Sequence, residues 1–257
     1  KLRQWLEAEK YYQKVILFDP VSGLAHYNLG LVYQHLEQVS EAEHHYRLAL
    51  QWLPESADLY NNLGTVLYTQ GNYLEAHTCY LKAMEQDASF YKAYHNLGRL
   101  YYVLSEIPLA IQSIRYAIEL CPTYFLAYSN YLYLLQFSPD ISAKDLFKEH
   151  VAWGQIVSET ITSPYLTYQN LLITSRRLKI AYLSPDFRLH PAASILEILF
   201  AHHDRQTFQV IAFADVAKPD IQTELLQSLA DEWYSIHGLA DQEVADLIYQ
   251  KQIDILI

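Results

Sequence analysis

The sequence predicts an all-α superhelix built from repeated helix pairs, followed by an α/β unit with a parallel sheet. Two observations predict this division. In the first half of the chain, several residue types recur at a spacing of 34. From Leu178 onward, apolar segments of strand length alternate with helical segments. The chain has 257 residues, 51% of them hydrophobic, which is enough for more than one packed domain.

The 34-residue recurrence involves several independent positions in one register. The triplet Asn-Leu-Gly begins at Asn28, Asn62 and Asn96. Two further positions keep alanine throughout: Ala42, Ala76 and Ala110 at one, and Ala49, Ala83 and Ala117 at the other. This period and pattern are typical of the tetratricopeptide repeat, in which each unit is a pair of antiparallel helices.

The repeats are expected to occupy residues 1–136. They comprise half a unit, three full units and the start of another: 1–22, 23–56, 57–90, 91–124 and 125–136. Because a solenoid needs capping units at its ends and no polar cap precedes Lys1, we also expect further repeats upstream.

Each recurring position has a packing role. The glycine of the first helix and the alanine twelve residues later are small, so the paired helices can approach closely. Larger side chains fill the space between helices: Tyr33, Leu67 and Tyr101 from first helices, and Tyr46, Tyr80 and Ile114 from second helices. This packing accounts for most of the 23 tyrosines.

One recurring residue is not required by packing. An asparagine occupies the same place in four successive first helices, at Asn28, Asn62, Asn96 and Asn130. First helices line the concave face of such a superhelix, and an amide offers a donor and an acceptor side by side, as a peptide unit does. We therefore expect the four side chains to bind the backbone of an acceptor protein. The alternative is that each asparagine bonds locally or is simply tolerated at that position, as in many tetratricopeptide repeats.

The second half of the chain changes its pattern. Residues 137–175 are predicted to form a helical junction, with Ser142 capping a helix that runs through Trp153 and a break at Ser163-Pro164. Residues 176–257 then alternate between strands and helices, which implies a parallel sheet. The strands are expected at 179–184, 208–213, 233–236 and 253–257, and the helices at 192–201, 221–230 and 242–250.

The loop after the first of these strands carries the candidate site. Parallel sheets bind ligands beyond the carboxyl ends of their strands, and the loop from Ser184 to Pro191 lies there. Pro191 suits the first turn of a helix. His190 is therefore expected beside a helix N-terminus, whose field favours a neutral imidazole and nearby anions. A helix-capping histidine without a ligand is the alternative.

The composition argues against several classes of function. The formal net charge is −11 and no basic stripe exists, which disfavours binding to nucleic acids and to anionic membranes. No apolar run is long enough for a membrane span and no signal peptide opens the sequence, so we expect a cytoplasmic protein. His202-His203-Asp204 is expected to cap a helix rather than bind a metal, and no Asp-x-Asp pair is present to hold a metal–diphosphate.

The segment from Ser184 to Pro191, SPDFRLHP, resembles the S-x-D-F-x-x-H-P motif that opens the catalytic region of O-GlcNAc transferase-like proteins, glycosyltransferase family 41. Stretches within 145–150, 203–210 and 243–256 resemble bacterial and SPINDLY-like members of this family. The repeats precede the motif in the family's order, so the resemblance extends over essentially the whole chain.

The resemblance implies a fold and an activity. The family's catalytic region is a GT-B fold, two Rossmann-like lobes with the active site between them, of which residues 176–257 would be an incomplete N-terminal lobe. The family transfers a sugar, with inversion and without a metal or other cofactor, from a nucleotide sugar to Ser or Thr hydroxyls of intracellular proteins. The superhelix recruits these acceptors. The donor is usually UDP-N-acetylglucosamine (UDP-GlcNAc), or GDP-fucose in SPINDLY-type members.

By the same resemblance, His190 is the catalytic residue, near the acceptor and the donor sugar, in a donor loop that contains Ser184, Asp186 and Pro191. The family's second lobe, which supplies most nucleotide contacts, is not in this sequence, so the chain alone is expected to be inactive. Two alternatives stay open: an O-fucosyltransferase, and a repeat-based interaction module without catalysis.

Overall fold

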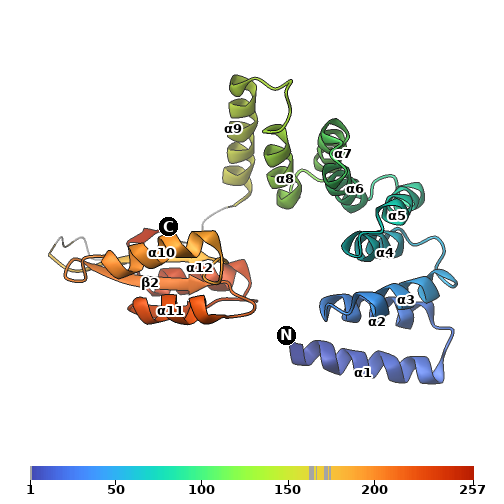
Figure 1. Ribbon diagram of the computed structural model, residues 1–257, viewed down its shortest axis with the longest axis horizontal. Helices are drawn as coiled ribbons and strands as arrows, with labels where there is room; N and C mark the ends of the chain where they lie inside the picture. Colours follow the sequence, from blue (N-terminus) through green and yellow to red (C-terminus); the bar gives the residue numbers. More distant parts are fainter. Residues whose placement is uncertain (1, 162–164, 166, 171–172, 174) are drawn as a thin grey trace. The chain divides into compact units, whose positions relative to one another are not determined.

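The computed structural model describes residues 2–161, 165, 167–170, 173 and 175–257 (Figure 1). The chain divides into two compact units, residues 1–162 and 163–257. The first is built from helices and the second contains a parallel sheet flanked by helices. The predicted fold class is therefore confirmed. No helix in the described ranges is both long and apolar enough to cross a membrane.

The described part of the first unit forms helices that stack in chain order (Figure 1). They are α1 (Leu2–Phe18), α2 (Gly23–His35), α3 (Val39–Leu50), α4 (Ala57–Thr69), α5 (Tyr73–Gln86), α6 (Tyr91–Val103), α7 (Ile107–Leu120), α8 (Phe125–Leu135) and α9 (Ala143–Thr160). Within each repeat the two helices pack closely, α2 with α3, α4 with α5 and α6 with α7. The first helices of successive repeats also touch, α2 with α4 and α4 with α6.

The repeat glycines sit where the two helices of a pair approach most closely. A Cβ at Gly30 would lie 2.5 Å from Cε1 of Tyr46, and one at Gly64 would lie 2.7 Å from Cε1 of Tyr80. Both tyrosine rings are buried, so neither can move aside at low cost. The expectation that small residues in one helix receive large residues from the other is confirmed.

The helix after the last predicted repeat continues the stack of helix pairs. Ser142 caps it as expected, since its Oγ accepts a hydrogen bond from the Asp145 N–H at 3.1 Å. Trp153 of α9 stacks on Tyr128 of α8 with ring centroids 4.5 Å apart, which fixes α9 against α8. The predicted break at Ser163-Pro164 lies outside the described residues.

The described residues of the second unit form four parallel strands in the order β3-β2-β1-β4. The elements follow one another as β1 (Leu178–Ser184), α10 (Pro191–His202), β2 (Phe208–Ala214), α11 (Ile221–Leu229), β3 (Glu232–Ser235), α12 (Asp241–Gln250) and β4 (Ile255–Leu256). This is the predicted alternation. The order reverses at β1, because β2 lies on one side of it and β4 on the other, and such a switch point is where ligands of α/β sheets bind.

The last strand is shorter than the predicted 253–257. Side chains add bonds at this edge: Asp254 Oδ2 accepts the Lys179 N–H at 2.9 Å, and the Asn170 amide donates to the Ile253 carbonyl at 3.1 Å. Regular pairing with β1 is confined to Ile255 and Leu256, although backbone bonds also join Asp254 N–H to the Lys179 carbonyl at 3.0 Å and Ile257 N–H to the Ala181 carbonyl at 2.8 Å.

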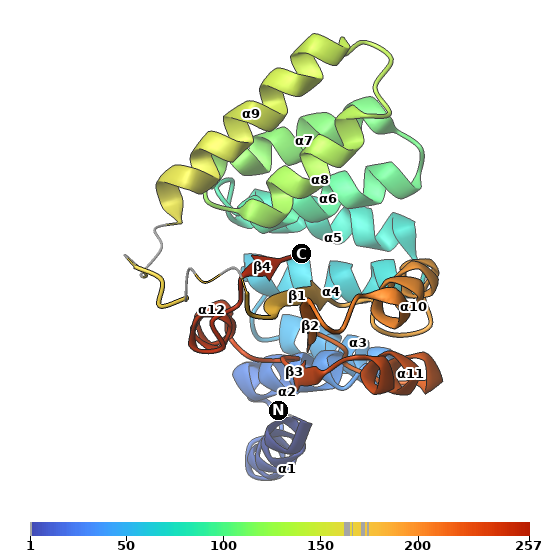
Figure 2. The ribbon, with the colours of Figure 1, turned by 90° about the vertical axis from the view of Figure 1, so that its left-hand side faces the viewer.

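Helices cover both faces of the sheet (Figure 2). On one face, α10 and α11 pack over a core that includes Phe200, Val210 and Leu226. On the other face, α12 packs over Ile211 and Phe213. Strands buried on both sides explain the continuous apolar character of β2 in the sequence.

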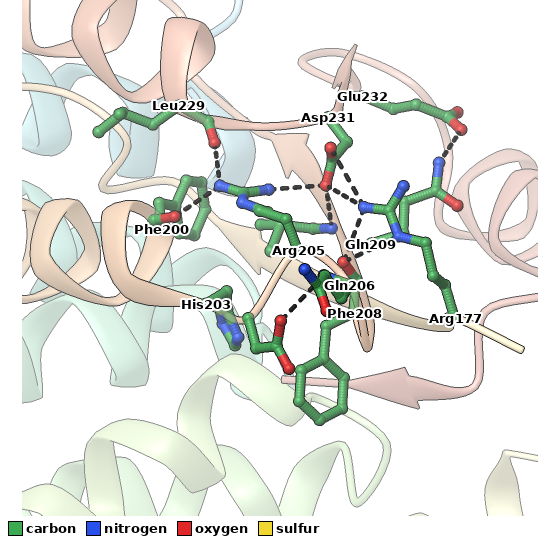
Figure 3. A network of polar contacts seen from close by, with 12 residues as sticks. Arg177, Phe200, His203, Arg205, Gln206, Phe208, Gln209, Leu229, Asp231 and Glu232 are labelled. Atoms are coloured by element: carbon green, nitrogen blue, oxygen red, sulfur yellow. Dashed lines mark hydrogen bonds and ion pairs between the residues drawn. The ribbon is translucent and has the colours of Figure 1, made fainter. Parts of the chain in front are cut away.

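A polar network stabilises the end of the sheet at which β2 and β3 begin (Figure 3). Arg205 donates to the carbonyls of Phe200 and Leu229, each at 2.5 Å, and to the Asp231 carboxylate at 2.6 Å. Asp231 also accepts the Val210 N–H. Burial alone would raise the pKa of Asp231, but these donors hold it below its usual value. The network joins the ends of α10 and α11 to the strands that follow them.

Candidate functional site

The loop between β1 and α10 is fixed by a hydrogen bond at its start and by a buried aromatic side chain. Ser184 Oγ accepts the N–H of Asp186 at 3.0 Å. Phe187 is fully buried, and its ring lies 5.3 Å from the Trp233 ring and 5.8 Å from the Phe200 ring, measured between centroids. The aromatic anchor makes the loop a fixed part of the sheet's carboxyl-end surface.

A second anchor joins this loop to the next one. Asp220 caps α11 by accepting the N–H groups of Gln222 and Thr223, both at 3.0 Å. Its other oxygen accepts the Leu189 N–H at 2.7 Å. These bonds, first of all the one from Leu189, hold the pKa of Asp220 below its usual value. The residue next to His190 is thus fixed to the start of a neighbouring helix.

His190 is the N-cap of α10, which begins at Pro191 as expected. Its Nδ1 accepts the Ala192 N–H at 3.2 Å, and Asp186 Oδ2 lies 3.6 Å from the same nitrogen. Because Nδ1 uses its lone pair for this bond, the proton of the neutral imidazole belongs on Nε2. The side chain is 41% exposed. His190 therefore caps the helix and still offers an Nε2–H donor to a ligand.

Two further polar residues at this edge were not predicted from the sequence. Asp215 follows β2 and His237 follows β3, and their Oδ1 and Nδ1 atoms are 2.8 Å apart. A cavity of about 340 Å³ lies beside this pair, bounded by Leu183, by Gly238 and by residues of α12 such as Val244. The sequence signal that could have identified the pair is position: Asp215 comes directly after β2 and His237 two residues after β3.

The adjacent histidines His202 and His203 lie at the end of α10 and bond to different groups. His202 Nδ1 lies 2.8 Å from the Ile198 carbonyl, which places its ring at the helix C-terminus as predicted. His203 instead bonds Tyr182 through Nε2 at 2.7 Å. The two rings have separate structural partners.

The repeated asparagines are half-buried on the first helices, and three of them bond to the preceding repeat. In these three, the amide nitrogen forms a hydrogen bond with the residue 35 positions earlier. The partners are Tyr27 Oη for Asn62 at 3.2 Å, Asn61 Oδ1 for Asn96 at 2.8 Å, and His95 Nε2 for Asn130 at 2.7 Å. Asn28 follows a unit of which only α1 is present. The side chains thus join neighbouring first helices through bonds between residues 35 positions apart.

These bonds leave part of the amide available at two of the four positions, whereas Asn62 Oδ1 accepts from the Asn61 amide at 3.3 Å. The donor side of Asn96 and of Asn130 is directed to the preceding repeat, while their Oδ1 atoms accept no hydrogen bond from the described residues. A carbonyl oxygen in this position can accept a backbone N–H from a bound polypeptide. The geometry therefore supports one half of the predicted peptide contact at these two positions.

Comparisons with known proteins place both units among relatives. Residues 21–89 and 61–125 match sequence profiles of the tetratricopeptide repeat. Two plant proteins named probable UDP-N-acetylglucosamine–peptide N-acetylglucosaminyltransferase SPINDLY are 28% identical to the chain, one from Oryza sativa subsp. japonica over 151 residues and one from Arabidopsis thaliana over 116 residues. These alignments cover 57% and 44% of the chain, and 16% and 13% of the relatives.

Solved structures extend the similarity to both units. A mutant O-GlcNAc transferase of Thermobaculum terrenum superposes with a TM-score of 0.73 and 26% identity, covering 91% of this chain and 46% of that protein. The repeat protein YrrB, described as having an unusual peptide-binding site, shares the fold at 21% identity and a TM-score of 0.50 over 62% of this chain. The chain thus spans less than half the length of the bacterial enzyme and about a sixth of the rice protein. Residues 21–125 contain tetratricopeptide repeats, and the chain is similar to an O-GlcNAc transferase in these repeats and in the α/β unit that follows them.

Proposed function

We propose that the chain is the repeat region and part of the first catalytic lobe of a protein O-glycosyltransferase. The whole protein would transfer N-acetylglucosamine from UDP-GlcNAc to Ser or Thr hydroxyls of other proteins. The observation that carries this proposal is the superposition on an O-GlcNAc transferase over 91% of the chain, which includes both units in the same order. The two cysteines are free thiols, which fits the cytoplasmic location that we propose.

In this proposal His190 holds a substrate oxygen during transfer. The acceptor hydroxyl attacks the anomeric carbon, the bond from that carbon to the diphosphate breaks, and the hydroxyl proton leaves to a base. The bond from Ala192 N–H to Nδ1 favours a donor at Nε2, which suits an oxygen of the nucleotide sugar. For His190 itself to be the base, the proton would have to move to Nδ1, toward Asp186 Oδ2 at 3.6 Å.

The repeats would recruit the acceptor protein. The first helices of successive repeats touch one another, as expected on the inner, concave side of a curved stack. In the asparagine row, the Oδ1 atoms of Asn96 and Asn130 would accept backbone N–H groups, so that binding depends little on the acceptor's sequence. Replacing Asn28, Asn62, Asn96 and Asn130 with Ala is expected to weaken the binding of unfolded polypeptides while helical content is kept. Unchanged affinity would remove the row from the proposal.

The donor assignment is tested with the whole protein. It is incubated with an unfolded Ser/Thr-rich acceptor and either UDP-GlcNAc or GDP-fucose, each labelled in the sugar, without added metal and with a chelator. Label transferred from UDP-GlcNAc alone is the expected result. Label from GDP-fucose alone would replace the donor in this proposal, and no label from either would leave an interaction module as the function.

A further inference from the structure

A cavity of about 260 Å³ opens on the face formed by the first helices. Its walls come from three successive repeats: Tyr68 from α4, Arg99 and Tyr102 from α6, and Asn130 and Tyr133 from α8. Tyr102 and Tyr133 are 37% and 49% exposed, whereas tyrosines that belong to a hydrophobic core are usually more buried. The cavity is therefore a surface site with aromatic walls.

Arg99 supplies a positive charge to this cavity. Its guanidinium lies over the Tyr68 ring, 5.2 Å from the centroid, and it has no ion pair among the residues that the structure describes. The chain as a whole has a net charge of −11, so an arginine without a carboxylate partner is notable here. Stacking on Tyr68 orients the guanidinium and leaves its N–H groups available.

The repeat fold does not require an arginine at this position. The three other units have uncharged residues there, Leu31, Thr65 and Tyr133, at multiples of 34 from Arg99. Helix packing explains the residues that recur and not a charge that occurs once. The charge therefore points to a role outside the packing of the repeats.

Asn130 adds a backbone contact next to this charge. Its Nδ2 meets His95 Nε2 at 2.7 Å, which leaves Oδ1 to accept from a ligand. Tyr102 and Tyr133 share one hydrogen between their hydroxyl oxygens, 3.2 Å apart, so one hydroxyl hydrogen of the two remains to donate. The site thus has a side-chain oxygen that can accept a peptide N–H, a fixed cation and aromatic walls. Together these groups suit one residue of an extended peptide.

We propose that this cavity binds an acidic side chain, Asp or Glu, of the recruited acceptor protein. Arg99 would pair with the carboxylate, Asn130 Oδ1 would accept a backbone N–H, and the tyrosines would cover the apolar part of the neighbouring residue. A single arginine favours a carboxylate, because sites for phosphorylated residues use clusters of arginines. The inference rests on the proposed recruitment of acceptors by the repeats and adds a sequence preference to it.

The test is selection from a degenerate peptide library by the immobilised 257-residue chain. Five consecutive positions vary over all amino acids, and the retained peptides are sequenced. An enrichment of Asp and Glu at one position by about fivefold is expected, the size of a partly exposed ion pair, with loss of the enrichment in high salt. Because the chain is acidic overall, non-specific attraction would deplete acidic peptides instead.

Matched variants assign the preference to the cavity. Arg99→Gln is expected to abolish the enrichment, and Arg99→Lys to keep part of it because the charge remains. Arg3→Gln, which removes a 91% exposed arginine from α1, is expected to change nothing. Circular dichroism confirms that each variant is folded.

The outcomes separate this inference from the proposed function. Peptides retained without acidic enrichment, or with enrichment that persists in Arg99→Gln, would overturn the assignment of the cavity and leave recruitment by the asparagine row intact. If no peptide is retained above a blank surface, recruitment by the repeats fails and the cavity assignment fails with it.

Discussion

His190 combines two roles in one side chain. As the N-cap of α10 it contributes to stability through Nδ1, and as an exposed donor it can bind substrate through Nε2. Asparagine separates these roles, because it is among the best N-cap residues, whereas its shorter side chain cannot place a donor at the position of Nε2 or act as an acid or base.

In the whole protein, His190→Asn is expected to keep the melting temperature while turnover falls by about 10²-fold or more. His190→Ala should lose the same activity and also about 1 kcal/mol of stability. Melting temperature and turnover are measured on the same samples. Normal turnover in His190→Asn would show that the histidine is only a cap.

His95 is a buried histidine, with 2% of its surface exposed. Burial, and the charge of Arg99, lower its pKa to about 4. The unfolded chain binds a proton near pH 6.5, whereas the folded chain resists it, so stability is full above pH 6.5 and falls as the pH drops toward 4. The loss from this one residue is at most about 3 kcal/mol.

Denaturant unfolding at pH 7.5 and pH 5 checks this prediction. His95→Gln is expected to lose less stability between the two pH values than the wild type does. His150→Gln, at an exposed position of α9, should show the wild-type difference. An unchanged pH dependence in His95→Gln would contradict the assignment.

The place of a functional side chain could be predicted from the sequence only where neighbouring residues in the chain determine it. His190 follows a strand and precedes a proline, so its place at a helix start could be derived from neighbours in sequence. The partners of the asparagine row could not, because Tyr27, Asn61 and His95 differ in type and show no recurrence. The pair of Asp215 and His237 depends on which strands lie side by side.

At the scale of elements, helix pairing depends on the repeat glycines. A Cβ at Gly64 would lie 2.7 Å from a buried Tyr80 ring. Gly64→Ala is expected to destabilise the chain by about 1–3 kcal/mol through overpacking, although alanine is the better helix former. Gly154→Ala is the matched control. Nothing lies within 4 Å of the added methyl there, so it should stabilise by about 0.5–1 kcal/mol.

Urea unfolding of both glycine variants measures these opposite signs. Equal effects from the two substitutions would mean that helix propensity alone matters and that the close approach of α4 and α5 has no energetic weight. The expected loss of stability at Gly64 comes from the packing of two helices, because Gly64 lies on α4 and the Tyr80 ring comes from α5.

The elements themselves were largely predictable from period and from capping residues. Ser142 and Pro191 marked helix starts correctly, since capping and proline geometry act within a few residues. The end strand is shorter than predicted, because only Ile255 and Leu256 pair regularly with β1. Backbone bonds still link Asp254 and Ile257 to this strand, so the predicted range does match the extent of the bonding.

For the whole molecule, alternation of strands and helices predicted a parallel sheet but not its order. Right-handed crossovers restrict the topology, yet they do not decide on which side of β1 the last strand pairs. The order β3-β2-β1-β4 comes from α12, which covers the face opposite to α10 and α11 (Figure 2).

In the proposed function this chain is part of a protein O-glycosyltransferase, and the groups that stabilise the leaving diphosphate belong to the rest of that protein. The direct measurement compares the whole protein with the 257-residue chain, both incubated with sugar-labelled UDP-GlcNAc and an unfolded Ser/Thr-rich acceptor. We predict O-linked label on the acceptor with the whole protein and none above background with the chain alone. Transfer by the chain alone would contradict the placement of the donor site, and no transfer by the whole protein would contradict the enzymatic function.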